Sequence, residues 1–189
     1  MSDFSPSGVA PTKSTMRAAL LAARRAVSGP ERRRRDTAIA AALAPLARGV
    51  VAAFVPLSEE PGDTGAYRNA HRSLLPVLSA GDDLDWAVYA GELAPGRFGL
   101  REPVGPRLGV DAVLTADLLI VPALAVDNRG RRLGRGGGSY DRVLARVAGT
   151  VPALAVVDGA EVVPAVPVEP HDMPVQGYVT PGGVHWLRS

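Results

Sequence analysis

Residues 117–147 read DLLIVPALAVDNRGRRLGRGGGSYDRVLARV. The part from Asp117 to Leu124 is an almost unbroken apolar run, which is typical of a strand buried on both faces of a sheet. The part from Ser139 to Val147 has the apolar spacing of a helix. A buried strand, a glycine-rich loop and a helix in this order are typical of an α/β fold. We therefore place this strand at the centre of a parallel sheet.

Further strands and helices are predicted on both sides of this stretch. We expect strands at Val50–Val55, Leu84–Tyr89, Val151–Val157 and Tyr178–Thr180. We expect helices at Thr12–Val27, from the cap residue Ser28 to Leu46, and after the polar loop Leu57–Gly65 as far as about Leu75, whereas the Gly- and Pro-rich segment Leu93–Asp111 is predicted as loop.

The alternation of strands and helices predicts one domain at residues 12–189, preceded by a disordered tail at residues 1–11. We expect an α/β fold, a three-layer α/β/α sandwich with a mainly parallel sheet. Ligands of such folds bind beyond the carboxyl ends of the strands, which selects the loops after Val55, Leu124 and Val157.

The composition narrows the class of protein. The chain has 189 residues, of which 47% are apolar and 21% charged, values that are ordinary for one globular domain. It contains no cysteine, which excludes disulfides and cysteine-ligated metal sites. No apolar run is long enough to span a bilayer, and residues 1–11 lack the pattern of a signal peptide. We therefore expect a cytoplasmic protein with no membrane partner. We also expect it to be a monomer.

The basic residues are unusual in kind. A net charge of +2 is too small to indicate a nucleic-acid partner. Lys13 is the only lysine among 21 basic residues, and it lies with Arg17 and Arg24 along one edge of the first predicted helix. The run Arg32–Arg35 begins the second helix and has no interleaved aromatic residues. We interpret this run as a solvated face and keep an Arg-rich RNA-binding module as an alternative.

Four of the five residues at 134–138 are glycines. Their backbone N–H groups can converge on an anion, and the next helix offers the positive end of its dipole. Arg132 and Arg135 supply donors suited to phosphate, and Asp141 lies where a carboxylate can hold Mg²⁺. The loop lacks the lysine of a Walker A motif and departs from Gly-x-Gly-x-x-Gly at Ser139. We predict a phosphate-binding loop of neither common type.

The loop with its flanks, Arg132–Arg142, resembles the signature of the 5-formyltetrahydrofolate cyclo-ligase family, also called 5,10-methenyltetrahydrofolate synthetases. Other blocks resemble the family in the same order along the chain, namely Lys13-x-x-x-Arg17, Phe98–Pro103, Asp117–Asp127 and Val168–Asp172. The resemblance thus extends over roughly residues 13–180.

This resemblance implies two substrates and a metal ion. ATP would be contacted by basic and loop residues, namely Lys13, Arg17, Arg132, Gly134, Arg135, Gly136, Gly137, Gly138, Ser139, Tyr140 and Asp141. Of these, Arg135 and Tyr140 would be catalytic. Asp141 and Asp172 would hold Mg²⁺, while Glu60, with Val55 nearby, would bind the pterin of the folate.

Two departures from the family pattern concern the site. Ser139 stands where the family has an aromatic residue. The loop Glu60–Thr64 is one residue longer than usual, so either Glu59 or Glu60 could contact the pterin, and we prefer Glu60 because it precedes proline.

The predicted function is the ATP- and Mg²⁺-dependent cyclisation of 5-formyltetrahydrofolate to 5,10-methenyltetrahydrofolate, with release of ADP and phosphate. A divergent relative that uses ATP on another small substrate is the main alternative. Neither of these two readings involves a nucleic-acid partner.

Overall fold

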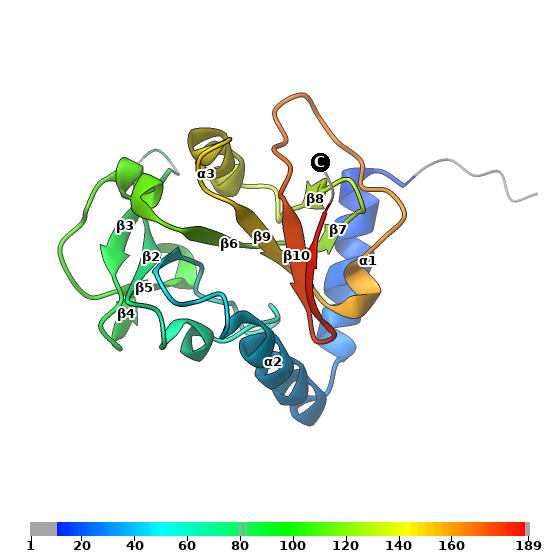
Figure 1. Cartoon of the computed structure of the whole chain (residues 1–189). Coiled ribbons are helices and arrows are strands. Elements are labelled where there is room, and N and C mark those ends of the chain that lie inside the picture. Colours follow the sequence, from blue (N-terminus) through cyan, green and yellow to red (C-terminus); the bar gives the residue numbers. More distant parts are fainter. Residues whose placement is uncertain (1–10, 80, 82, 188–189) are drawn as a thin grey trace, which may run out of the picture.

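The computed structural model describes residues 11–79, 81 and 83–187 (Figure 1). The tail predicted at residues 1–11 lies, apart from Pro11, outside the described residues. Among the described residues, no helix is both long and apolar enough to cross a membrane.

The centre of the molecule is a seven-stranded sheet with the order β11-β10-β9-β6-β1-β2-β3. Its strands are β1 (Val50–Ala52), β2 (Arg72–Leu78), β3 (Leu84–Val88), β6 (Leu118–Pro122), β9 (Ala153–Val156), β10 (Gly177–Thr180) and β11 (Gly183–Trp186). The five inner strands run parallel, and the edge strands β3 and β11 pair antiparallel with their neighbours. β6 lies in the middle of the sheet, which confirms the predicted central strand and the mainly parallel arrangement.

Both faces of the sheet are covered because successive side chains of each strand point to opposite sides. In β6, Leu118 and Ile120 belong to one apolar cluster, whereas Leu119 and Val121 belong to the other. Helix α2 (Gly29–Leu43) adds Ile39 and Leu43 to the first cluster, and helix α3 (Ser139–Val147) adds Val143, Leu144 and Val147 to the second. Figure 1 shows these helices on opposite sides of the sheet, so the predicted three-layer α/β/α sandwich is confirmed.

Helix α1 (Lys13–Ala26) packs on a third, smaller apolar cluster. The cluster consists of Leu124, Ala125, Leu133 and Val166, with Met16, Leu20 and Leu21 of α1 against it. Ala125 and Leu133 belong to a short hairpin formed by β7 (Ala125–Val126) and β8 (Arg132–Leu133). Because this hairpin leads into the glycine-rich loop, α1 covers the base of that loop.

The helix predicted to reach Leu75 is wrong. A single 3₁₀ turn, η1 (Thr64–Tyr67), is followed by a turn at residues 68–71 and then by strand β2. Leu74 and Leu75 enter opposite apolar clusters, an arrangement that suits a strand between two covered faces. Pro76, which would break a continuing helix, pairs opposite Trp86 of β3. The neighbouring strands therefore override the local pattern.

Other elements also differ from the prediction. Strand β1 ends at Ala52, before the predicted Val55, and the chain from residue 53 belongs to the loop that lines the pocket. Helix α2 ends at Leu43, before the predicted Leu46, and a turn follows. The segment predicted as loop at Leu93–Asp111 contains a hairpin and two 3₁₀ turns, namely β4 (Leu93–Pro95), β5 (Arg101–Pro103), η2 (Arg97–Gly99) and η3 (Val110–Thr115, which extends past it). Strand β11 was not predicted, because four residues at an exposed edge leave little apolar pattern.

Candidate active site

A pocket of about 500 Å³ lies at the carboxyl edge of the sheet. Residues that directly follow β1 and β6 line it, including Phe54, Val55 and Leu124. The chain passes from β1 to β2 on one side of the sheet and from β6 to β9 on the other, so the pocket lies where the strand order changes direction. The segment directly after Val157 does not line this pocket, although residues 169 and 171–172, further along, do.

The residues predicted to contact ATP, Mg²⁺ or the pterin all line this one pocket. They are Lys13, Arg17, Val55, Glu60, Arg132, Gly134, Arg135, Gly136, Gly137, Gly138, Ser139, Tyr140, Asp141 and Asp172. The fold thus brings together four parts of the chain that are far apart in sequence.

The base of the glycine loop is held by Asp127, which is fully buried. Its carboxylate accepts hydrogen bonds from the backbone N–H groups of Arg129 (2.9 Å), Arg131 (3.2 Å) and Val166 (3.0 Å), and from Nε of Arg131 (2.6 Å). One side chain therefore closes the β7–β8 turn and fastens it to the segment at Val166. The family block that ends at Asp127 contained this residue, but no role was predicted for it.

The loop itself requires glycine at two positions. Gly136 and Gly138 have φ values of +107° and +70°, which residues with a side chain rarely adopt. Gly138 is the N-cap of helix α3 and has no side chain with which to cap it. Helix N-termini bind anions because their first N–H groups lack carbonyl partners within the helix. The loop and the first turn of α3 both line the pocket, and their geometry suits an anion.

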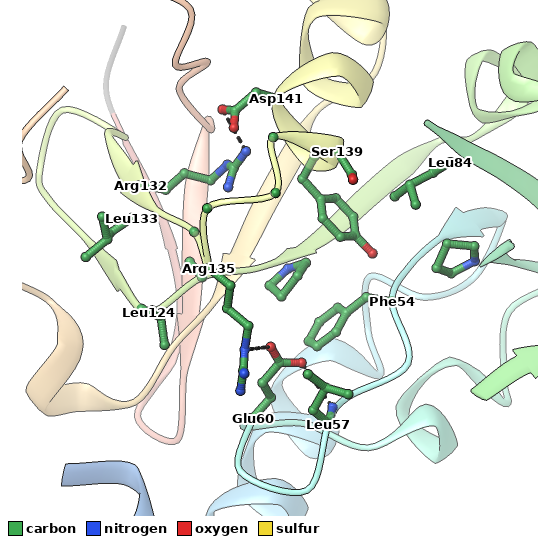
Figure 2. A pocket seen from close by; sticks show the side chains of 18 of the residues that line it. Phe54, Leu57, Glu60, Leu84, Leu124, Arg132, Leu133, Arg135, Ser139 and Asp141 are labelled. Carbon is green, nitrogen blue, oxygen red and sulfur yellow. Dashed lines mark hydrogen bonds and ion pairs between the residues drawn. The ribbon is translucent and has the colours of Figure 1, made fainter. Parts of the chain in front are cut away.

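Two ion pairs extend from this loop (Figure 2). Arg132 is almost completely buried, and its Nη2 lies 2.8 Å from Oδ1 of Asp141. Asp141 Oδ1 also accepts the backbone N–H of Met173 at 3.2 Å. Burial lowers the pKa of Arg132, while the charges of Asp141 and Asp172 oppose that change. Asp141 is therefore oriented before any ligand binds.

The second ion pair joins Arg135 to Glu60. Nε of Arg135 lies 2.9 Å from Oε1 of Glu60, and Oε2 of Glu60 accepts the backbone N–H of Leu57 at 3.0 Å. Glu60 is buried and lines the pocket, whereas Glu59 does not line it and its side chain is 32% exposed. The geometry therefore places Glu60, the preferred candidate, in the pocket.

Lys13 and Arg17 approach the loop from α1. Nε of Arg17 donates to the carbonyl oxygen of Gly134 at 2.9 Å. Nζ of Lys13 lies 2.6 Å from Asp172 and 2.7 Å from Glu169. Burial opposes the charge of Asp172, but the hydrogen bonds from Lys13 and from the backbone of Glu169 outweigh it and hold the pKa of that carboxyl below its usual range. The basic edge of α1 is thus matched by acids of the segment before β10.

The side chains of Glu169, His171 and Asp172 form a group that sequence reasoning did not assemble. Each offers one possible metal-ligating atom, and these atoms lie within 4.8 Å of one another. All three line the pocket beside Lys13. Asp172 is the member of this group that was predicted as a metal ligand.

Tyr140 lies in the first turn of α3 and lines the pocket. Burial, and then the nearby charge of Glu60, raise the pKa of its hydroxyl well above the ordinary value. The phenol therefore stays protonated at neutral pH, a state in which it can donate a hydrogen bond but cannot act as a base.

One side of the pocket is apolar and was not predicted. Phe54, Leu57, Leu84 and Leu100 line it, together with Phe98 at the tip of the β4–β5 hairpin. Such residues have no signal in a single sequence, because apolar residues at strand ends resemble core residues. The hairpin had one signal, since Phe98–Pro103 was among the family-like blocks.

Two basic groups have partners that the sequence did not indicate. Arg24, predicted on the same edge of α1 as Lys13 and Arg17, is buried in a bidentate ion pair with Glu161 at 2.6 and 2.8 Å, and it donates to the carbonyl of Ala123 at 2.6 Å. The run Arg32–Arg35, expected to be solvated, is so only in part. Its second and third members are exposed, whereas its first and last are half-buried and bonded to the protein.

These features define the class to which the protein belongs, namely α/β proteins with a glycine-rich loop at the point where the sheet changes direction. The chain belongs to the 5-formyltetrahydrofolate cyclo-ligase family, whose sequence pattern matches residues 9–181. It is therefore an enzyme, a ligase of folate one-carbon metabolism, as the resemblance of Arg132–Arg142 predicted.

Individual relatives agree with this assignment. A 5-formyltetrahydrofolate cyclo-ligase of Mycolicibacterium smegmatis is 42% identical over 183 residues, which cover 90% of this chain and 94% of that protein. The protein of the same name from Escherichia coli strain K12 is 36% identical over 137 residues, 68% of this chain and 73% of its own length. The NMR structure of Aquifex aeolicus 5,10-methenyltetrahydrofolate synthetase matches with a TM-score of 0.79 at 30% identity, covering 94% of this chain and 93% of that one.

Proposed function

We propose that this enzyme converts 5-formyltetrahydrofolate into 5,10-methenyltetrahydrofolate while ATP is cleaved to ADP and phosphate, with Mg²⁺ required. The observation that carries the proposal is the division of one pocket into two halves of different chemistry. The glycine loop lines one half with Lys13, Arg17, Arg132 and Arg135. Phe54, Leu57 and Leu84 line the other half with the buried Glu60 (Figure 2), and Arg101 and Glu102 of the β4–β5 hairpin also contribute to the lining. The first half suits a triphosphate and the second a flat heterocycle.

The cationic half supplies donors for the phosphates of ATP. Arg132 gives the most direct indication, because its buried Nε has no hydrogen-bond partner among the described residues. A buried donor without a partner is costly, and a phosphate oxygen would satisfy it. Lys13, Arg17 and Arg135 would add charge, and the loop N–H groups would bind further phosphate oxygens.

The apolar half suits the pterin ring of the folate. Phe54, Leu57 and Leu84 offer walls against which a flat ring can pack (Figure 2). Glu60 lies between these walls and the glycine loop, and its carboxylate can accept two adjacent N–H groups of a pterin. In this role Glu60 would exchange its bond to Arg135 for bonds to the substrate.

The chemistry of the donors fits Mg²⁺. Asp141 and Asp172 line the cationic half with side chains that are 19% and 13% exposed, and each is held in place by a cation, Arg132 or Lys13. Proteins usually bind Mg²⁺ through one or two carboxylates together with substrate phosphates. When bound there, the ion would neutralise charge on the transferring phosphoryl group.

The reaction needs alignment and charge stabilisation. The formyl oxygen on N5 attacks the γ-phosphorus of ATP, and the bond to the bridging oxygen breaks as ADP leaves. N10 then attacks the activated formyl carbon and loses its proton, and the carbon–oxygen bond breaks as phosphate departs. Arg135 and the loop N–H groups would stabilise the transferring phosphoryl group, and the neutral hydroxyl of Tyr140 would donate a hydrogen bond.

An activity assay tests the proposal. Purified protein with 5-formyltetrahydrofolate, ATP and Mg²⁺ should form the methenyl chromophore and ADP in equal amounts, and omission of ATP or of Mg²⁺ should stop both. Absence of the chromophore at every protein concentration, while ATP still raises the melting temperature, would refute the folate substrate and leave the reading of another small substrate.

A further inference from the structure

We infer that Arg32 and Asp36 of helix α2 are positioning residues that hold the loop carrying Glu60 in the orientation required for the folate substrate. This inference rests on the function proposed above, because it assigns the effect to the pterin half of the pocket.

Helix α2 forms hydrogen bonds with the Glu60 loop on both sides of the glutamate. Nη1 of Arg32 donates to the carbonyl oxygen of Ser58 at 2.6 Å, and the backbone N–H of Gly62 donates to Oδ1 of Asp36 at 2.9 Å. Residues four apart lie on the same face of a helix, so both side chains reach the loop from one surface. The three residues between the two anchors include Glu60.

The loop depends on these anchors because it has no regular structure of its own. Residues 57–62 belong to neither a helix nor a strand, and Gly62 has a φ of +114°. The carboxylate of Glu60 closes the loop through its bond to the N–H of Leu57, which is next in sequence to Ser58, the residue that Arg32 holds. A ligand-binding group is most effective when its support fixes it before the ligand arrives.

Arg32 also connects the loop to the other half of the pocket. Its Nη2 donates to the carbonyl oxygen of Arg24 at 3.1 Å, in the last turn of α1. The same helix carries Lys13 and Arg17. The side chain of Asp36 accepts a hydrogen bond from Gly62 of the Glu60 loop, whereas Arg32 bonds to both the loop and α1. Replacement of Asp36 therefore perturbs the loop more selectively than replacement of Arg32.

The test compares two variants of Asp36 with a matched control on the same helix. Asp36→Ala removes the acceptor for the Gly62 N–H and should raise KM for 5-formyltetrahydrofolate about five- to tenfold, leaving KM for ATP and kcat close to wild type. Asp36→Asn keeps an acceptor oxygen and should restore the wild-type KM. Arg33→Ala removes an exposed side chain of the same turn and should leave every constant unchanged.

The pattern of constants separates positioning from a general structural role. A purely structural role would lower the melting temperature and the active fraction while both KM values stayed the same. An unchanged folate KM in Asp36→Ala, an equal rise in both KM values, or an Asn variant as defective as the Ala variant would overturn the inference. If wild-type protein forms no methenyl product, it is the proposed function that fails.

A second variant keeps the test open if Asp36→Ala does not fold. Arg32→Met removes the bond to Ser58 and should also raise KM for the folate, with an additional rise in KM for ATP because α1 loses a contact. Equilibrium binding of 5-formyltetrahydrofolate without ATP should weaken by the same factor as its KM. A Met variant with wild-type folate binding would contradict the role of Arg32.

Discussion

Replacement of Asp127 by asparagine should loosen the turn that supports the glycine loop. An asparagine side chain has one acceptor oxygen and one donor amide, so it can keep the bonds at Oδ1 to the N–H groups of Arg129 and Arg131. It loses those at Oδ2, which come from the N–H of Val166 and from Nε of Arg131. Its amide would also face these two donors.

The magnitude follows from the two lost bonds. The bond to the Val166 N–H contributes about 1 kcal/mol and the charge-assisted bond to Arg131 about 2 kcal/mol, so the free energy of unfolding should fall by roughly 3 kcal/mol. For a chain of this length, that corresponds to a fall in melting temperature of about 6–12 °C. Urea unfolding followed by circular dichroism at neutral pH measures it. The control is Asp111→Asn, because Asp111 pairs with Arg146 while its side chain is 76% exposed, and its loss should cost at most about 0.5 kcal/mol.

The pH dependence of the free energy of unfolding provides a second comparison of wild type with Asp127→Asn. Burial opposes ionisation of Asp127, but the N–H groups of Val166 and Arg129 and the side chain of Arg131 outweigh it and hold its pKa below the usual range. Its contribution to stability is therefore present above the unfolded pKa of about 4 and is lost as the pH falls through the lower folded pKa. The difference between wild type and Asp127→Asn should shrink below about pH 4. A loss under about 1 kcal/mol at neutral pH, or a difference that does not depend on pH, would refute this reasoning.

Three other changes test the site and its frame. Glu60→Gln should lower kcat/KM for the folate about ten- to a hundredfold with little effect on ATP binding, and a change confined to KM for ATP would contradict the pterin role. Arg135→Met should lower kcat at least about a hundredfold, and a rate within threefold of wild type would count against its role in phosphoryl transfer. Arg24→Met leaves Glu161 buried without its partner and should cost roughly 3–5 kcal/mol, whereas the double variant with Glu161→Gln should recover part of that loss in thermal unfolding.

The elements that were predicted correctly are those whose apolar pattern reflects one uniform kind of burial. Strand β6 is buried on both faces, and α3 has one apolar stripe, so each carries a continuous pattern. Strand β2 was not predicted because its seven residues mix apolar, polar and proline positions. Its extended conformation depends on pairing with β1 and β3. Strand β11 is short and exposed, and its formation depends on β10.

The residues of the site also fall into those that could be predicted from sequence and those that could not. Glycines, cations and carboxylates are chemically distinctive, and the resemblance of their blocks to the family allowed the residues of the cationic half of the pocket to be predicted. Phe54, Leu57 and Leu84 are chemically identical to core residues, and only the fold shows that they face a cavity. Contacts between residues far apart in the sequence could not be predicted either. No local pattern indicates that Arg24 pairs with Glu161 or that Asp36 binds the Glu60 loop.

The small apolar cluster beneath α1 has a consequence for how the protein opens. Leu124, Leu133 and Val166 belong to a cluster separate from the two large clusters on the sheet faces, and α1 packs against this cluster. Regions with fewer buried contacts open at a lower free energy than the central strands. Amide protons of α1 should therefore exchange with solvent sooner than those of β6. The α1 side of the cationic half can therefore change its position while the hydrogen bonds of the central sheet stay intact.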